Sequence, residues 1–326
     1  MADHLTATDL FAGAGGSSEG LTQAGIRVAI AANHWQLAVD THHDNHPDTE
    51  HRTANLRETD WRTFPSTDLL WASPSCRKHA RASAQKRRTA AEEKAAKDAA
   101  AIDRATAFAV VEAAEVHRYP VIFIENVPEF REWVLYPWFL DGLRVLGYTI
   151  TEAIHDAVDF GLAQARRRLF VAATLAGVEL DLTPPVVEPV AAASILDLAS
   201  TPLRPMTRRL YISDQIDTIT EDDVPYLVTY RNHAKARRAD QHPLATVTAG
   251  GNHHAVAQLI DGVPHQRLLT NRECARAQGF GDHYTFRGTP AEVKRQIGNA
   301  VPVGIARWLG ERATAALGGH VLEPAA

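Results

Sequence analysis

The sequence predicts an α/β protein with one large domain built on a parallel sheet and a smaller, irregular domain. Apolar runs such as 26–32 and 121–127 are continuous rather than alternating, as is typical of parallel strands that are buried on both faces. Segments with helical periodicity separate these runs, which indicates strand–helix–strand units. From residue 183 onward prolines cluster and both periodicities fade. We therefore predict a large domain of residues 1–180 and 290–326 and a second domain of residues 181–289.

Length and composition agree with this division and exclude several classes of protein. The 326 residues exceed what one hydrophobic core usually holds, and the net charge of −5 is not that of a strongly basic nucleic-acid-binding protein, so any basic surface must be local. No apolar run approaches about 18 residues and the first residues lack a signal-peptide pattern, so we expect a cytoplasmic protein without membrane contact. Two cysteines are too few for a disulfide framework, and Cys274, among apolar neighbours at helical spacing, is expected in the core.

The first strand is predicted at residues 5–10 and leads directly into a glycine-rich turn that opens a helix. Gly13, Gly15 and Gly16 allow positive φ angles and let a ligand lie against bare backbone. The N–H groups at the start of the following helix favour an anionic group such as a carboxylate. The spacing departs from the dinucleotide fingerprint, so a turn that serves only packing is the alternative.

The second and third strands are predicted to end near His34 and Asn55. In doubly wound folds, the residue at the end of the second strand commonly contacts the ribose of a bound nucleotide. His34 occupies this place, and Trp35 beside it can cover an adenine ring.

The fourth strand, residues 68–72, delivers Cys76 to the start of a strongly basic segment. Arg77, Lys78 and Arg81 follow the cysteine, and nearby positive charge favours the reactive thiolate. The alternative is that Cys76 is a small apolar residue that closes the strand.

A helix is predicted at residues 105–118, and the fifth strand at 121–127 carries Glu125 near its carboxyl end. Ligands of open α/β sheets bind at this end of the strands, so Glu125 is expected at the same crevice as Cys76 and the glycine turn. A helix-capping or ion-paired carboxylate is the alternative.

A helix at 138–146 and a strand at 149–157 are predicted ahead of an alternating polar segment. Gln164, Arg166 and Arg168 are spaced by two residues and would share one face of a strand. Three such groups suit an anion or the edge of a base, although a solvated edge strand has the same pattern.

The second domain carries two segments that are rich in hydrogen-bond donors, 230–238 and 246–254. Arg231 and Arg237 lie in the first segment, and such donors contact phosphates and base edges. A solvated charged face is the alternative. Further helices are predicted at 267–280 and through Trp308.

Six short motifs occur in an order that resembles the cytosine-C5 DNA methyltransferase family. They are Asp9-Leu-Phe-Ala-Gly-Ala-Gly-Gly, Pro74-Ser-Cys76, Glu125-Asn-Val127, Gln164-Ala-Arg-Arg-Arg168, Arg272-Glu-Cys-Ala-Arg-Ala-Gln-Gly-Phe280 and Gly298-Asn-Ala-Val-Pro302. The resemblance implies a Rossmann-like, S-adenosylmethionine-dependent methyltransferase domain and a smaller target-recognition domain. It also implies that double-stranded DNA lies in the cleft with the target base flipped out of the helix.

The resemblance gives each matching residue an expected role. Cys76 corresponds to the nucleophile that adds to C6 of cytosine, Glu125 to the carboxyl group that acts at N3, and Arg168 to the donor to O2. Arg166 and Gln164 correspond to residues that brace the catalytic loop, and Gln164 is also expected at the DNA. The DNA contacts expected outside these motif positions are Arg77, Lys78, Arg81, Arg231 and Arg237.

For S-adenosylmethionine, the resemblance implies contacts from Phe11, Gly13, Gly15, Gly16, Trp35, Pro74, Asn299 and Val301. His34 stands where the family usually has a Glu for the ribose hydroxyls, and Asn55 where it commonly has an Asp near the adenine amine. Both neutral side chains can still hydrogen-bond. They indicate either weaker cofactor binding or a cofactor with an extra negative group. Ser75 and Arg77 also depart from the Pro-Pro-Cys-Gln of the family.

The function predicted from these residues is DNA cytosine-C5 methylation by a monomer that needs no metal and that is solitary or paired with a restriction nuclease. One alternative is a cytosine-C5 transferase with an altered cofactor or an RNA substrate. The other is a catalytically silent DNA-binding relative. Cys76, Glu125 and Arg168 are all present, which argues against the silent relative.

Overall fold

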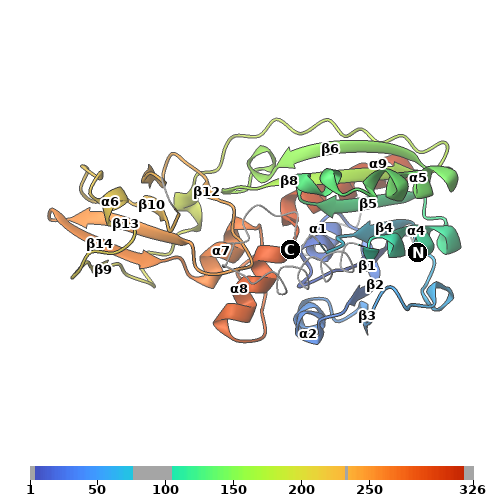
Figure 1. Cartoon of the computed structure of the whole chain (residues 1–326), viewed down its shortest axis with the longest axis horizontal. Helices are drawn as coiled ribbons and strands as arrows, with labels where there is room; N and C mark the ends of the chain where they lie inside the picture. Colours follow the sequence, from blue (N-terminus) through green and yellow to red (C-terminus); the bar gives the residue numbers. More distant parts are fainter. Residues whose placement is uncertain (1–3, 76–104, 232–233, 319–326) are drawn as a thin grey trace. The chain divides into compact units, whose positions relative to one another are not determined.

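The computed structural model describes residues 4–75, 105–231 and 234–318 and divides into two compact units (Figure 1). Unit 1 consists of Met1–His155, Arg167–Thr183 and Ala300–Ala326, and unit 2 of Asp156–Arg166 and Pro184–Asn299. Residues 156–166 and 290–299, which we predicted for the large domain, therefore group with unit 2. The roles predicted for the two domains stay predictions.

A seven-stranded sheet forms the centre of unit 1. Its strands are β1 (Thr6–Leu10), β2 (Arg27–Asn33), β3 (Glu50–Thr53), β4 (Leu69–Ala72), β5 (Val121–Asn126), β6 (Thr149–Asp156) and β8 (Arg167–Thr174), in the order β3-β2-β1-β4-β5-β8-β6. β1 to β5 run parallel to one another, and β8 runs antiparallel to β5. The predicted α/β fold is confirmed, because the continuous apolar runs form these central strands.

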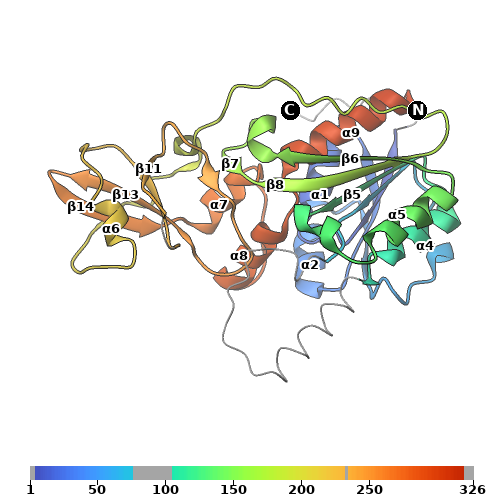
Figure 2. The ribbon, with the colours of Figure 1, turned by 45° about the horizontal axis from the view of Figure 1, so that its top comes forward.

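Helices cover both faces of this sheet (Figure 2). On one face, α4 (Phe108–His117) and α5 (Tyr136–Val145) enclose a core with Leu70, Ile122 and Val171. On the other face, α1 (Gly16–Gln23) packs against α9 (Val303–Leu317). The remaining helical segments among the described residues of unit 1 are α2 (Gln36–Asn45) and the short turns η1 (Trp61–Thr63) and η2 (Pro128–Glu132). Among the described residues, no helix is long and apolar enough to cross a membrane.

Two glycines let α1 approach the C-terminal segment of unit 1 closely. A Cβ at Gly16 would lie 2.4 Å from the carbonyl oxygen of Val301, and a Cβ at Gly20 would lie 2.6 Å from that of Val303 and from Cβ of Ala306. Any larger residue would force these backbones apart. The last motif of the chain therefore returns to the glycine turn that follows β1.

Unit 2 contains more regular structure than the sequence indicated. A five-stranded antiparallel sheet has β9 (Arg204–Pro205), β10 (Tyr226–Thr229), β11 (Arg237–Arg238), β13 (His254–Ile260) and β14 (Val263–Leu268) in the order β11-β10-β13-β14-β9. A separate parallel pair joins β7 (Gln164–Ala165) to β12 (Leu244–Ala245). The helical segments are η3 (Ala157–Phe160), η4 (Ala192–Ile195), α6 (Ser213–Ile216), α7 (Asn271–Ala277) and α8 (Pro290–Asn299). Most of these strands are short and partly exposed, which explains their weak apolar pattern.

The helix predicted at 267–280 begins later than expected. Arg267 belongs to β14, and α7 begins at Asn271. Thr270 caps α7, since its side chain accepts from the Glu273 N–H and Glu273 accepts from the Thr270 N–H. This reciprocal pair of bonds fixes the start of the helix.

We expect Gly20→Ala to lower the free energy of unfolding by roughly 1–3 kcal/mol, because the added methyl group overpacks the contact between α1 and α9. Thermal or urea unfolding measures the loss. Gly250→Ala is the matched control, because a Cβ at Gly250 would meet nothing within 4 Å. Equal stability of the two variants would contradict the close approach of the helices.

Candidate active site

The carboxyl ends of the parallel strands gather most of the site residues predicted in unit 1. Phe11 follows β1, His34 follows β2, Asn55 lies just after β3, Pro74 lies just after β4, and Glu125 lies near the end of β5. Because these strands are parallel neighbours, their carboxyl ends lie along one edge of the sheet. Ligands of open α/β sheets bind at such an edge.

The turn after β1 has the backbone geometry of a ligand cradle. Gly13 and Gly15 have φ angles of 58° and 94°, and Phe11, which is not a glycine, has a φ of 60°. Non-glycine residues in this region are uncommon and occur often at functional sites. A Cβ at Gly13 would meet only the Phe11 carbonyl oxygen, at 3.9 Å, and α1 begins directly after Gly15. The turn therefore fits the anionic end of a cofactor such as S-adenosylmethionine.

His34 and Trp35 lie where β2 gives way to α2, as predicted for the adenosine side of a cofactor. The Trp35 N–H donates to Asn33 Oδ1 at 2.9 Å, Trp35 is half-buried, and His34 is exposed. Asn55 is also exposed, and its side-chain amide donates to Glu58 Oε1 at 2.9 Å. Contact between Asn55 and a cofactor would compete with this local bond.

Asp9, for which the sequence suggested no role of its own, is hydrogen-bonded to the start of α1, directly after the glycine turn. Its Oδ2 accepts from the hydroxyls of Ser17 and Ser18 at 2.6 and 2.7 Å. The side chain is fully buried, and its Oδ1 has no hydrogen-bond partner among the described residues. Burial raises the pKa of Asp9 to about 7, although the serine bonds oppose this shift.

A chain of histidines continues from this carboxyl group. His42 Nε2 lies 2.8 Å from Ser18 Oγ, and His42 Nδ1 lies 2.8 Å from His51 Nε2. The rings of His42 and His46 are 4.7 Å apart. Burial, together with the neighbouring histidines, lowers the pKa of His42, His46 and His51. For His46 the pKa falls to about 4. Neutral imidazoles therefore connect α1, α2 and β3 behind the turn.

Glu125 and Arg168 form a nearly buried ion pair at the end of β5. Nε of Arg168 lies 3.1 Å from Glu125 Oε1, and the two side chains are 13% and 8% exposed. The adjacent Asn126 side chain donates to the Pro74 carbonyl at 3.1 Å. Pro74 precedes Cys76 by two positions, so the segment that leads to the predicted nucleophile is tied to the strand that carries Glu125. Glu125 is thus an ion-paired carboxylate, which was the alternative considered for it, and its partner Arg168 is the residue predicted to donate to O2 of cytosine.

The predicted nucleophile and the basic residues that follow it belong to a segment that the structure does not describe. Cys76, Arg77, Lys78 and Arg81 lie outside the described residues. Their roles stay predictions.

Gln164 and Arg166 are buried inside unit 2, where they brace the chain. The two terminal nitrogens of Arg166 donate to the carbonyls of Val247 and Gly298, both at 2.9 Å. The Gln164 amide donates to the Ala277 carbonyl at 3.1 Å, and its oxygen accepts from the Val247 N–H at 2.7 Å. Both side chains are therefore enclosed by unit 2 in this structure. The DNA contact predicted for Gln164 and the bracing of the catalytic loop predicted for both residues stay predictions.

The remaining predicted residues differ in exposure. Asn299 ends α8 and is exposed, whereas Val301 is buried against Gly16. Arg231 and Arg237 are exposed in unit 2, as a contact with DNA requires.

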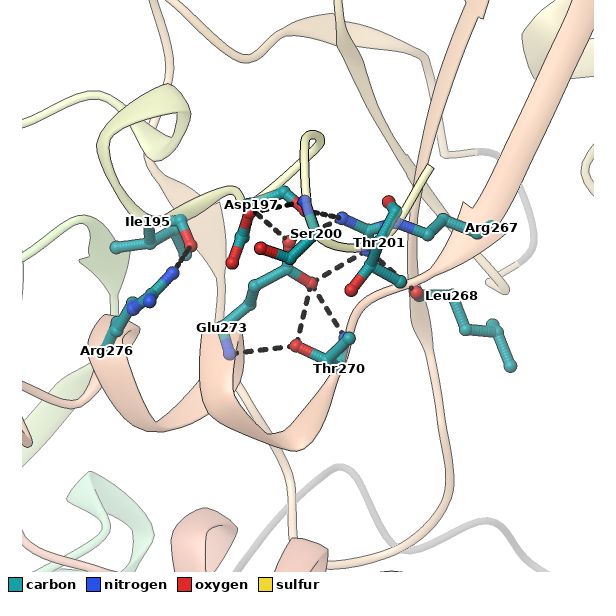
Figure 3. A network of polar contacts seen from close by, with 9 residues as sticks. All are labelled: Ile195, Asp197, Ser200, Thr201, Arg267, Leu268, Thr270, Glu273 and Arg276. Carbon is teal, nitrogen blue, oxygen red and sulfur yellow. Dashed lines mark hydrogen bonds and ion pairs between the residues drawn. The ribbon is translucent and has the colours of Figure 1, made fainter. Parts of the chain in front are cut away.

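A buried ion pair in unit 2 was missed by the sequence analysis (Figure 3). Arg267 donates to both carboxylate oxygens of Glu273, at 2.6 and 2.8 Å, and Glu273 also accepts from the Asp197 N–H at 2.9 Å. Burial opposes the charge of Glu273, but Arg267 and the backbone donors hold its pKa below the usual range. The pair joins β14, α7 and the segment at Asp197. The capping pattern of Thr270 and Glu273 was a readable signal, whereas the pairing with Arg267 was not.

Cys274 is fully buried, which confirms its predicted place in the core. Its sulfur lies 2.9 Å from the Lys294 nitrogen, and burial raises the pKa of the thiol. Among the described residues, no group of His, Cys, Asp and Glu side chains could hold a metal ion.

Comparison with known proteins identifies the enzyme class. The model of the C-5 cytosine-specific DNA methylase family matches residues 5–314. The chain belongs to this family. The predicted enzyme class is therefore confirmed, and so is S-adenosylmethionine, the methyl donor of the family.

Several relatives of the methylase are similar over almost its whole length. The type II methyltransferase M.HgiDI of Herpetosiphon aurantiacus is 28% identical over 310 residues, which cover 92% of this chain and 91% of the relative. M.NlaX of Neisseria lactamica is 25% identical over 328 residues, which cover 95% and 96%.

Solved structures show the same fold. The methyltransferase EhMeth of Entamoeba histolytica superposes with a TM-score of 0.72 at 15% identity and covers 97% of this chain and 99% of its own. A DNMT2 variant of Spodoptera frugiperda gives a TM-score of 0.69 at 14% identity, with 95% and 99% covered.

We expect acidification from about pH 6.5 to pH 4 to lower the free energy of unfolding of the methylase. In the folded protein His46 and His254 take up a proton only near pH 4, whereas in the unfolded chain they do so near 6.5. The unfolded state binds more protons in this window, so stability that is present above pH 6.5 is lost as the pH falls. Each of these two histidines contributes at most about 3 kcal/mol to this loss in the free energy of unfolding. Urea unfolding at neutral and at acidic pH measures the loss.

Asp9 acts in the opposite sense, because its raised pKa gives stability that is lost as the pH rises toward 7. One carboxyl group is outweighed by His42, His46 and His254 together. His46→Gln should flatten the pH dependence. An unfolding free energy independent of pH between these limits would contradict the buried neutral histidines.

Proposed function

We propose that this methylase transfers a methyl group to C5 of a cytosine flipped out of duplex DNA, through a covalent bond between Cys76 Sγ and C6 of the base. The observation that carries the proposal is the Glu125–Arg168 pair at the carboxyl end of β5. A carboxyl group and a guanidinium side by side match N3 and O2, adjacent atoms on one edge of cytosine. The family supplies the reaction class, and this pair supplies the groups that bind the ring.

The chemistry requires each of these groups. C5 of cytosine is a poor nucleophile until the Cys76 thiolate adds to C6 and turns the ring into an enamine. Charge that develops on the ring is relieved when Glu125, in its protonated form, gives a proton to N3 and Arg168 donates to O2. C5 then takes the methyl group as the bond from that group to the cofactor sulfur breaks. The proton on C5 leaves to a base, the proton on N3 returns to Glu125, and the thiolate is expelled as the C5–C6 double bond forms again.

The cofactor edge is assembled from the turn after β1 and the start of α2. S-adenosylmethionine supplies an electrophilic methyl group when it is bound. Phe11 and the backbone from Gly13 to Gly16 would form the turn that holds its anionic end, Trp35 would cover the adenine, and His34 would hydrogen-bond the ribose. Val301, which packs against Gly16, closes this side of the cradle.

Unit 2 and the basic segment after Cys76 would hold the DNA. Flipping a base costs a few kcal/mol, which contacts with the pocket and with phosphates must recover. Arg77, Lys78 and Arg81 follow the nucleophile, and Arg231 and Arg237 are exposed on unit 2. The similarity to type II methyltransferases supports an enzyme that works beside a restriction nuclease. We propose that it acts as a monomer in the cytoplasm.

A duplex that contains 5-fluorocytosine should trap the methylase. Fluorine at C5 cannot leave as a proton does, so in the presence of S-adenosylmethionine a covalent complex should accumulate. Denaturing electrophoresis followed by peptide mass analysis should place one methylated base on Cys76. An adduct formed with RNA and not with DNA, or attached to another residue, would contradict the proposal.

Substitutions separate the nucleophile from the groups that bind the ring. Cys76→Ala should abolish adduct formation and leave DNA binding intact. Glu125→Gln keeps the shape of the side chain but loses the proton donor, so we expect methyl transfer to slow by roughly 10²–10⁴-fold. Glu129→Gln, on the neighbouring η2 turn, is the matched control. Full activity of Glu125→Gln would remove Glu125 from the mechanism.

A further inference from the structure

We infer that Tyr211 and Tyr230 of unit 2 form a stacking platform for a base of the bound DNA that has lost its neighbour in the helix. The inference rests on the proposed function, because flipping the target cytosine is what leaves a base unstacked. Aromatic side chains are the usual partners of such bases, since every base presents a π-face.

The two rings already lie in the geometry of a stack. Their centroids are 6.3 Å apart and their planes differ by 10°. Tyr230 is half-buried and packs against a small core that contains Ile212 and Val228. Tyr211 is 59% exposed, so much of its surface is open to solvent although its ring is stacked with that of Tyr230.

Both tyrosines are held by ordered backbone. Tyr230 directly follows β10, and its N–H donates to the His253 carbonyl at 2.8 Å. Tyr211 directly precedes Ile212, which is fully buried where α6 begins. Leu210, on the other side, donates its N–H to Ser213 Oγ at 2.8 Å. A platform fixed in this way loses little conformational entropy when a base stacks on it.

The charge around Tyr230 indicates which ligand the platform takes. Residues 224–239 contain no acid, although the whole chain has a net charge of −5. Arg231, Lys235 and Arg237 are exposed in this stretch, whereas Arg238 is paired with Glu221 and Asp240. Exposed cations that closely follow a polar aromatic residue in the chain suit a nucleotide, whose phosphates and base would be held together.

The alternative is that Tyr211 only covers the core under Tyr230. The two possibilities predict different binding behaviour. Stacking contributes affinity that does not depend on salt, whereas a phosphate contact changes the slope of affinity against salt concentration. A purely structural tyrosine would change neither once the protein is folded.

The test compares Tyr211→Leu and Tyr211→Phe in the full chain. The probe is a labelled duplex of mixed sequence with single mismatched cytosines, which unstack readily. Fluorescence anisotropy over a series of salt concentrations gives affinity and slope. Tyr211→Leu should weaken binding by roughly ten-fold with the slope unchanged, and Tyr211→Phe should bind as the wild type does.

Two further variants make the comparison specific. Arg237→Gln should weaken binding and reduce the salt slope by about one, as the loss of a phosphate contact does. Trp138→Leu removes an aromatic side chain of unit 1 that is 70% exposed, and it should leave binding unchanged. Circular dichroism verifies that each variant is folded.

Failure of this inference and failure of the proposed function can be told apart. If wild-type protein binds the duplex but transfers no methyl group, the proposed function is wrong, and the comparison of Tyr211→Leu with Tyr211→Phe still decides the platform. Equal affinity of Tyr211→Leu and wild type overturns the platform whatever the methyl transfer shows. A loss of affinity in Tyr211→Phe as large as that in Tyr211→Leu also overturns it, because the hydroxyl rather than the ring would then make the contact.

Discussion

The structure of unit 1 depends on the close packing of α1 against the C-terminal segment that contains Val301 and α9. Only glycine fits at positions 16 and 20, because a Cβ at either would lie within 2.6 Å of backbone or Cβ atoms of that segment. Gly310 of α9 makes the reverse contact, where a Cβ would lie 2.8 Å from that of Ala24. The same contact sets Val301 beside the turn whose positive φ angles shape the cofactor cradle. The contact that joins the C-terminal segment to α1 therefore also positions the backbone next to the glycine turn.

Unit 2 depends instead on charged and polar groups that are buried with their partners. Arg166 joins β7 to the carbonyls of Val247 and Gly298, and Arg267 joins β14 to Glu273 of α7. Removal of one partner from such a site leaves a buried unpaired charge and costs about 3–5 kcal/mol. Three of the six sequence motifs thus supply residues that scaffold unit 2. The chemistry that we propose is concentrated in the motifs at Cys76 and Glu125.

The sequence predicted what depends on local pattern. The buried strands, the glycine turn and Glu125 at the end of β5 follow from apolar runs and their last residues. The hairpin of β13 and β14 was not predicted, although the sequence carries its signal: Asp261 and Gly262 form the Asp-Gly turn with two positive φ angles, 50° and 72°, that favours such hairpins. The hydrogen bonds from Asp9 through Ser18 to His42 could not be predicted, since they join three elements whose packing no local pattern encodes.

The electrostatics of the cofactor edge follow from these neutral groups. Two acids that the family usually places there are replaced by His34 and Asn55, and burial of Asp9 makes even that carboxyl group a weak acid. His42 and His46 stay neutral behind the turn. The proposed adenosine side of this edge therefore offers neutral hydrogen-bonding groups where the family usually has acids. In the proposed complex, backbone N–H groups of the glycine turn would hold the anionic end of the cofactor, and Trp35 would cover the adenine.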